Sequence, residues 1–183
     1  MRQRPRWCAI VRRGTALAAS LALAVSFSAR ADVTGIVVAV GDGDSITVVD
    51  ASRIQHRIRL ASIDAPEIGQ PGGSRARESL SQLVYEREVR VEGNKQDRFG
   101  RIIGKVWVVP SSCPRCGKTL DAGLAQVTMG EAWWFRRYAK QQSPEDRGRY
   151  EFAEQEARGK KAGLWHEPDP VPPWEWREDR RRD

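Results

Sequence analysis

Residues 33–49 alternate apolar and polar side chains around the sequence Gly41-Asp42-Gly43-Asp44. Alternation with a period of two residues is typical of a half-buried β-strand. An Asp-Gly pair between two such runs is a strong signal for a hairpin turn. The first two strands of the fold are therefore predicted here, with four small or acidic residues at their junction.

Three more strands and three helices are predicted downstream. In the third strand Ile58, Leu60 and Ser62 share one face, and Ser74 caps the first helix. Five short strands with interspersed helices are typical of a small barrel, so the predicted fold class is α+β, mainly β: a five-stranded OB-type β-barrel with about three helices. The strands are predicted at residues 57–63, 89–92 and 102–109, and the helices at residues 74–85, 120–130 and 144–161.

The apolar positions of these helices give their expected inward faces. Leu80, Leu83 and Val84 are expected to point inward from the first helix. In the third helix the expected inward residues are Tyr150, Phe152, Ala153 and Ala157.

The N-terminal 31 residues have the pattern of a secretory signal peptide. Basic residues are followed by an uncharged, mostly apolar stretch at residues 15–27, which is too short for a membrane-spanning helix of about 20 residues. Ala29-Arg30-Ala31 then supplies a small-x-small cleavage site. We predict cleavage after Ala31, a domain at residues 32–166, a Pro-rich charged tail without its own core at residues 167–183, and a periplasmic or secreted product.

Removal of this segment changes the charge balance. The whole chain has 31 basic and 24 acidic residues, but residues 1–31 contain six arginines and no acid. The remaining chain has 25 basic and 24 acidic residues, so overall charge gives no argument for a polyanionic partner. Any such surface must come from local clustering of charge.

Three clusters along the chain resemble the staphylococcal nuclease (thermonuclease-like) family, in order and at suitable spacing. They are Asp42-Gly43-Asp44-Ser45, Arg59-Leu60-Ala61-Ser62-Ile63-Asp64-Ala65-Pro66-Glu67 and Asp97-Arg98-Phe99-Gly100-Arg101. The resemblance implies an OB-type barrel and a Ca²⁺-dependent nuclease that acts on DNA and RNA.

Asp44 and Asp64 are the candidate metal ligands. Both follow or end predicted strands that can be neighbours in a barrel, and an oxygen-only pair favours Ca²⁺, Mg²⁺ or Mn²⁺. The resemblance implies Ca²⁺ as the cofactor, with the backbone carbonyl of Ala65 as a further ligand. Asp42 is a secondary candidate. For Asp42 and Asp44 the alternative is a purely structural role in the hairpin turn.

The resemblance also implies three catalytic side chains. Glu67 corresponds to the general base that draws a proton from the attacking water. Arg59 and Arg101 correspond to two arginines that hold the charged transition state, for which a guanidinium can bind two oxygens at once. The structural alternatives are a solvated turn for Glu67, an Arg59–Asp64 ion pair and an exposed hairpin charge for Arg101.

Cys113 and Cys116 are the two cysteines that remain after signal removal. A CxxC motif can be half of a zinc ribbon, a redox site or a local disulfide. No second Cys or His pair accompanies it, and Gly117-Lys118 disfavours the helix that a redox motif opens. We predict a local disulfide that pins a loop.

These features predict an exported, monomeric phosphodiester hydrolase, and the resemblance implies that it produces 3′-phosphate ends. The alternative is a non-catalytic nucleic-acid-binding OB-fold protein. That alternative predicts the loss of at least one candidate site residue, whereas all of them are present. A third class, a periplasmic redox or metal-relay protein built on the CxxC motif, would not require them.

Overall fold

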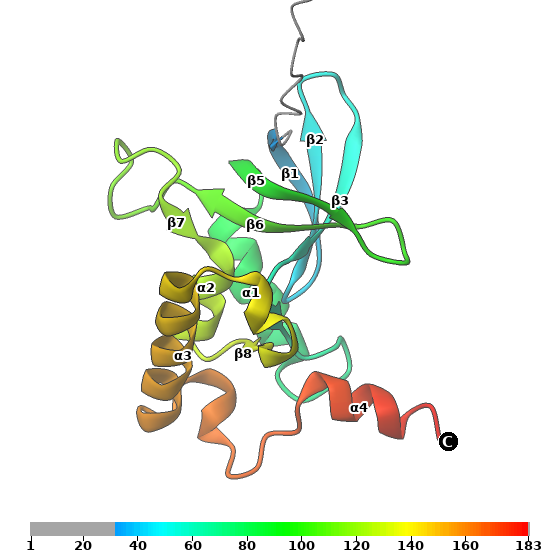
Figure 1. Ribbon diagram of the computed structural model, residues 1–183, viewed down its shortest axis with the longest axis vertical. Helices are drawn as coiled ribbons and strands as arrows, with labels where there is room; N and C mark the ends of the chain where they lie inside the picture. Colours follow the sequence, from blue (N-terminus) through cyan, green and yellow to red (C-terminus); the bar gives the residue numbers. More distant parts are fainter. Residues whose placement is uncertain (1–31, 183) are drawn as a thin grey trace, which may run out of the picture.

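A closed β-barrel forms the centre of the computed structural model, which describes residues 32–182. The parallel pairing of β3 with β6 closes five strands into the barrel, while the other strand pairs are antiparallel (Figure 1). The predicted class, a five-stranded OB-type barrel with helices, is confirmed. The sheet order is β3 (Gln55–Leu60), β2 (Ser45–Asp50), β1 (Val33–Asp42), β5 (Glu88–Gln96), β6 (Ile102–Val108) and β7 (Leu120–Asp121).

The barrel interior is filled by apolar residues at alternate positions of the strands. Val37, Val48, Ile58, Val91 and Val106 all have zero exposure. In β1 the strict alternation breaks because the pairing with β2 shifts register between residues 37 and 39. Such a bulge bends the strand and increases its twist, which favours closure of a small barrel.

Three helices cover one end of the barrel: α1 (Gly73–Val84), α2 (Ala122–Thr128) and α3 (Pro144–Gly159) (Figure 1). The predicted inward positions Leu80 and Val84 are fully buried, and Leu83 packs against the core. The predicted cap at Ser74 is wrong. The N-cap is Gly72, whose left-handed backbone, with φ of 87°, starts the helix without a side-chain hydrogen bond.

Two further predictions of side-chain direction are wrong. Phe152 is 64% exposed, because α3 packs through Tyr150, Ala153 and Ala157, and position 152 faces away from that side. Ser62 does not continue the third strand. The chain leaves β3 after Leu60, turns through Ser62 with φ of 69°, and resumes as the short strand β4 (Ile63–Asp64).

Short elements complete the domain. β4 pairs with β8 (Trp133–Trp134), and 3₁₀ turns cover Arg136–Gln141 and Gly163–His166. The loop between β6 and β7 contains the predicted disulfide, Cys113–Cys116, which is confirmed.

The C-terminal segment carries a helix that the sequence pattern does not predict, α4 (Pro173–Asp179). Trp174 packs on Phe135 and on Trp133, with ring centroids 5.5 Å and 6.4 Å apart. The side-chain amide of Gln70 donates a hydrogen bond of 2.6 Å to the carbonyl of Val171. The segment therefore lies along the domain instead of standing free in solvent.

None of the helices within residues 32–182 has the length and apolar character needed to cross a membrane. The predicted signal peptide and its cleavage site after Ala31 lie outside the described residues.

Candidate active site

The turn between β1 and β2 carries Asp44 to the end of the barrel beside α1. Gly43 is required there, because a Cβ atom would lie 2.6 Å from the Cβ atoms of both Ala65 and Ala76. The carboxylate of Asp42 accepts a hydrogen bond of 3.0 Å from the backbone N–H of Asp44, an arrangement typical of an Asx turn. Asp42 thus shapes the turn that positions Asp44.

The strand register brings Arg59 next to Asp44. Ser45 of β2 pairs with Arg59 of β3, so the residue before Ser45 lies beside the guanidinium. Arg59 Nη1 forms an ion pair with Asp44 Oδ2, and Arg59 Nη2 donates to Asp64 Oδ1 at 2.9 Å. The backbone N–H of Ala65 donates to Asp44 Oδ2 at 2.9 Å. One guanidinium therefore bridges the two predicted metal ligands.

This cluster lies in the protein interior. Asp44 and Asp64 are 3% and 1% exposed, and the Arg59 side chain is 18% exposed. Burial raises the pKa of the Asp44 carboxyl to about 7, because Arg59 offsets only part of the desolvation and the charges of Asp42 and Asp64 add repulsion. Burial would lower the pKa of Arg59, yet the adjacent Asp44 and Asp64 carboxylates raise it.

Glu67 lies on the loop between β4 and α1, at the solvent-facing rim of the same cluster. Its side chain is 36% exposed. The backbone N–H of Glu67 donates to the side-chain oxygen of Gln70 at 3.1 Å, and Gln70 N–H returns a bond of 2.9 Å to the Glu67 carbonyl. This reciprocal pair fixes the loop, so Glu67 is held near Asp64 but open to water.

Arg177 of α4 reaches into the site from the C-terminal segment. Its Nη1 donates to Glu67 Oε1 at 2.6 Å and to Asp64 Oδ1 at 3.2 Å, and its Nη2 donates to Asp64 Oδ2 at 2.6 Å. Burial lowers and the two carboxylates raise the pKa of Arg177, with a net increase. Two guanidinium groups therefore share three carboxylates.

Arg101 is placed differently from the other predicted residues. It follows the turn between β5 and β6, where Gly100 has φ of 74° and its N–H bonds to the carbonyl of Asp97. The Arg101 Nε donates to Asp97 Oδ2 at 2.7 Å. Among the described residues it contacts none of the site carboxylates. The structure thus brings together Asp44, Arg59, Asp64 and Glu67, with Asp42 behind them, but leaves Arg101 on its own hairpin.

The donor atoms at this site are all oxygens. Within residues 32–182, no three His, Cys, Asp or Glu side chains are grouped so that they could hold a metal ion. The side chains of Asp44 and Asp64 nevertheless meet at the Arg59 guanidinium, and the backbone N–H of Ala65 donates a hydrogen bond to Asp44. Two buried carboxylates beside one backbone segment fit a hard cation that keeps most of its other ligands as water or phosphate.

Two supporting residues were missed by sequence reasoning: Arg177 and Gln126. Gln126 is fully buried on α2 and donates to the carbonyls of Gly43 and Ala76 at 3.0 Å and 2.9 Å. It therefore anchors the turn that carries Asp44. The sequence signal for Gln126 is an amide side chain at an inward position of a predicted helix. A buried amide needs hydrogen-bond partners, so it indicates an anchoring role.

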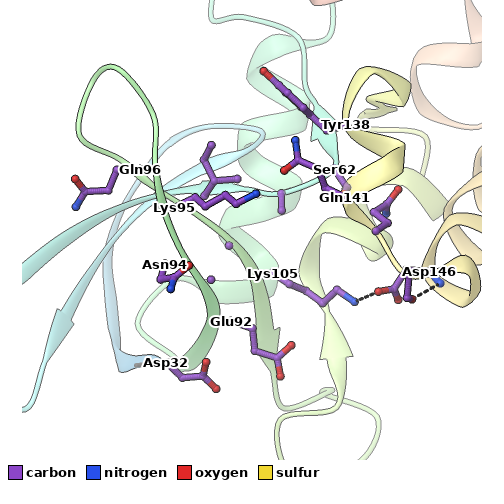
Figure 2. A pocket seen from close by; sticks show the side chains of 16 residues that line it. Asp32, Ser62, Glu92, Asn94, Lys95, Gln96, Lys105, Tyr138, Gln141 and Asp146 are labelled. Carbon is purple, nitrogen blue, oxygen red and sulfur yellow. Dashed lines mark hydrogen bonds and ion pairs between the residues drawn. The ribbon is translucent and has the colours of Figure 1, made fainter. Parts of the chain in front are cut away.

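A cavity of about 610 Å³ lies away from this site. It is lined by residues of β5, β6 and the loop before α3, including Lys105, which pairs with Asp146 at 2.6 Å (Figure 2). None of the predicted catalytic or metal-binding side chains lines it. The second cavity, about 500 Å³, borders Glu67 and Arg177.

The fold is an OB-type barrel, and the site at its end combines oxygen donors with guanidinium groups, which suits the recognition of phosphate esters. The family model described as "Staphylococcal nuclease homologue" matches residues 57–167. The chain belongs to the staphylococcal nuclease family. This membership confirms the predicted enzyme class, a nuclease.

Curated relatives agree with this assignment. The chain is 44% identical over 164 residues to "Micrococcal nuclease" of Shigella flexneri, covering 88% of this chain and 90% of that protein. It is 42% identical over 171 residues to "Protein ParB" of Escherichia coli, covering 92% and 93%. An "Uncharacterized endonuclease" of Escherichia coli is 38% identical over 147 residues, covering 80% and 86%.

Proposed function

We propose that this protein is an exported, Ca²⁺-dependent nuclease that hydrolyses phosphodiester bonds in DNA and RNA and acts as a monomer. The observation that supports this proposal is the buried Asp44–Arg59–Asp64 cluster with Glu67 at its open rim. A purely structural ion pair would not need a third carboxylate on the solvent side. The partial exposure of Glu67, whose Oε1 accepts from Arg177, supports its assignment as a proton acceptor at the open side of the site.

Asp44, Asp64 and the carbonyl of Ala65 would hold the Ca²⁺ ion. When bound, this ion supplies positive charge that acidifies water and offsets the charge of the phosphate. The buried carboxylates have a role of their own, because they fix Arg59 between them. A fixed guanidinium stabilises developing charge without reorganising during the reaction.

Glu67 is assigned as the general base. It takes a proton from the water that attacks phosphorus, the bond to the 5′ oxygen breaks, and that oxygen takes a proton from solvent, which leaves a 3′-phosphate end and a 5′-hydroxyl. Its exposure of 36% gives water access to the carboxylate. Proton transfer to a positioned side chain contributes about 10²- to 10⁴-fold to a rate.

Arg59 and Arg101 are assigned to the equatorial oxygens of the transition state. Arg59 already faces the carboxylate cluster. Arg101 is held at the base of a tight turn by Asp97, so a phosphate that takes it must replace this carboxylate partner. Both roles need the planar fork of a guanidinium, which an ammonium does not provide.

The competing function is a non-catalytic OB-fold that only binds nucleic acid. A nicking assay on supercoiled DNA separates the two: the mature protein is incubated with Ca²⁺, then with a chelator in excess. We expect cleavage with Ca²⁺ and its loss with the chelator. Equal cleavage under both conditions would remove the metal from the proposal, and binding without cleavage would favour the competing function.

Glu67→Gln tests the base directly. The amide keeps the size of the side chain but cannot accept the proton, so we expect turnover to fall about 10²- to 10⁴-fold with little change in substrate binding. Asp169→Asn, at an acidic residue away from the site, serves as the matched control. Equal turnover in wild type and Glu67→Gln would reject the base assignment.

A further inference from the structure

A groove beside Glu67 combines arginines and aromatic side chains from separate segments of the chain. This cavity of about 500 Å³, here called the α4 groove, has α4 and the residues after it as one wall. Arg98 of the β5–β6 turn and Arg137 of the 3₁₀ turn after β8 also line it. Residues 168–183 lie beyond the segment that the family model matches, so α4 is an addition to the matched region.

The charge of the α4 groove is strongly positive. Five arginines line it, against the two acids Glu67 and Glu178. Within the described chain Arg98, Arg137 and Arg180 form no ion pair with a carboxylate. Arg181 donates through Nε only to the backbone carbonyl of Arg177, at 3.1 Å. Since residues 32–183 contain 25 basic and 24 acidic residues, this groove is a local concentration of charge on a nearly neutral domain.

Aromatic rings lie next to these charges. Phe135, Trp174 and Trp176 line the groove, and Phe135 and Trp174 are tilted against each other by 35°. The indole N–H of Trp176 is buried without a hydrogen-bond partner among the described residues. Arginines that bind phosphates beside rings that stack on bases are the usual composition of a single-strand binding surface.

The position of the groove relates it to the chemistry. Glu67 lines the groove, and Arg177 connects its α4 wall to Glu67 and Asp64. A strand bound in the groove therefore has its backbone beside the proposed base. A duplex does not fit the aromatic side chains equally well, because its bases are paired and stacked on each other.

We propose that the α4 groove binds a single strand of DNA or RNA next to the reaction centre. Its arginines, chiefly Arg180 and Arg181, hold the phosphates, and Trp176 contacts a base. This inference rests on the proposed nuclease function in one respect, namely that the bound strand is the substrate. The groove itself is a binding site that can be tested without cleavage.

Binding is measured by fluorescence anisotropy with short labelled single strands of DNA and of RNA, on the full mature chain in excess chelator. The double variant Arg180→Ala/Arg181→Ala is compared with Arg115→Ala/Arg149→Ala, which removes two exposed arginines outside the groove. We expect the groove variant to raise Kd roughly tenfold and to reduce the salt slope by about 1.4, two contacts at about 0.7 each. The control pair should change neither.

Trp176→Ala supplies the second measurement. Wild type should bind a normal strand at least about fivefold more tightly than an abasic strand of equal length, and the variant should lose most of that difference. Identical Kd values and salt slopes for the two double variants would overturn the inference. A duplex that binds as tightly as a single strand would overturn the single-strand assignment. Wild-type binding of this kind without cleavage under Ca²⁺ would contradict the proposed function alone.

Discussion

The candidate site has two halves that differ in burial and in origin. The barrel half consists of Asp44, Arg59 and Asp64, whose side chains are 18% exposed or less. The rim half consists of Glu67 and Arg177, which are 36% and 39% exposed. Strand register places the first half, whereas a loop and a C-terminal helix place the second.

This difference implies different mechanical roles. Ion pairs in the barrel half are removed from water, so breaking one leaves an uncompensated buried charge that costs several kcal/mol. The Arg177–Glu67 ion pair at the rim is partly solvated, and an exposed pair is worth about 1 kcal/mol or less. The barrel half is therefore expected to stay fixed, and the rim half to exchange partners during binding and turnover.

Arg59→Lys gives the largest expected effect, because it breaks the barrel half. An ammonium cannot bridge Asp44 and Asp64 in the same geometry, so we expect turnover to fall about 10²- to 10³-fold. The free energy of unfolding should also fall, by roughly 1–3 kcal/mol. Steady-state kinetics and urea unfolding followed by tryptophan fluorescence measure the two effects.

Arg101→Lys is the matched variant outside both halves. Arg101 donates to Asp97 and lies over the ring of Phe99 on its own hairpin, so stability should stay within about 0.5 kcal/mol while turnover falls. If Arg59→Lys lost stability but kept turnover, Arg59 would have only the structural role of pairing with Asp64. Normal turnover in Arg101→Lys would likewise mean that Arg101 is only a charge on its hairpin, without a catalytic role.

Arg177→Ala tests the rim half. This variant should strengthen Ca²⁺ binding, whereas Arg59→Lys should reduce turnover and stability. Arg177 donates to both oxygens of Asp64, so its removal takes a positive charge away from a proposed Ca²⁺ ligand. We expect Ca²⁺ affinity, measured by calorimetry without nucleic acid, to increase roughly three- to tenfold.

The control for Arg177 is Arg182→Ala, which removes a charge from the same segment that pairs with Asp179 and not with the site. It should leave Ca²⁺ affinity unchanged. Weaker Ca²⁺ binding in Arg177→Ala would show that Arg177 orders the ligand carboxylates instead of competing with the ion.

The smallest effect is expected from removal of the disulfide by Cys113→Ser/Cys116→Ser. The bond closes a loop with a sequence separation of only three residues, and so a stability loss of at most about 2 kcal/mol follows from loop entropy. Because the loop between β6 and β7 belongs to neither half, turnover at a temperature well below unfolding should match wild type. A large loss of turnover would mean that this loop supports the site.

Local pattern was sufficient for the elements that local interactions specify. Alternation and the Asp-Gly turn predict the β1–β2 hairpin. Resemblance to a family, and not the pattern alone, selected Asp44, Arg59, Asp64 and Glu67 as one site. The structure brings these four residues together, and their assigned roles stay predictions.

What only the tertiary structure decided is the C-terminal wall of the site. Arg177 lies 113 residues from Asp64 along the chain, so no periodicity or local motif could relate them. The seven-residue helix α4 is too short to be stable by its own propensity and forms where Trp174 packs on Trp133 and Phe135. Local sequence patterns do not include that contact, because the energy that stabilises the helix comes from surfaces that meet only in the folded domain.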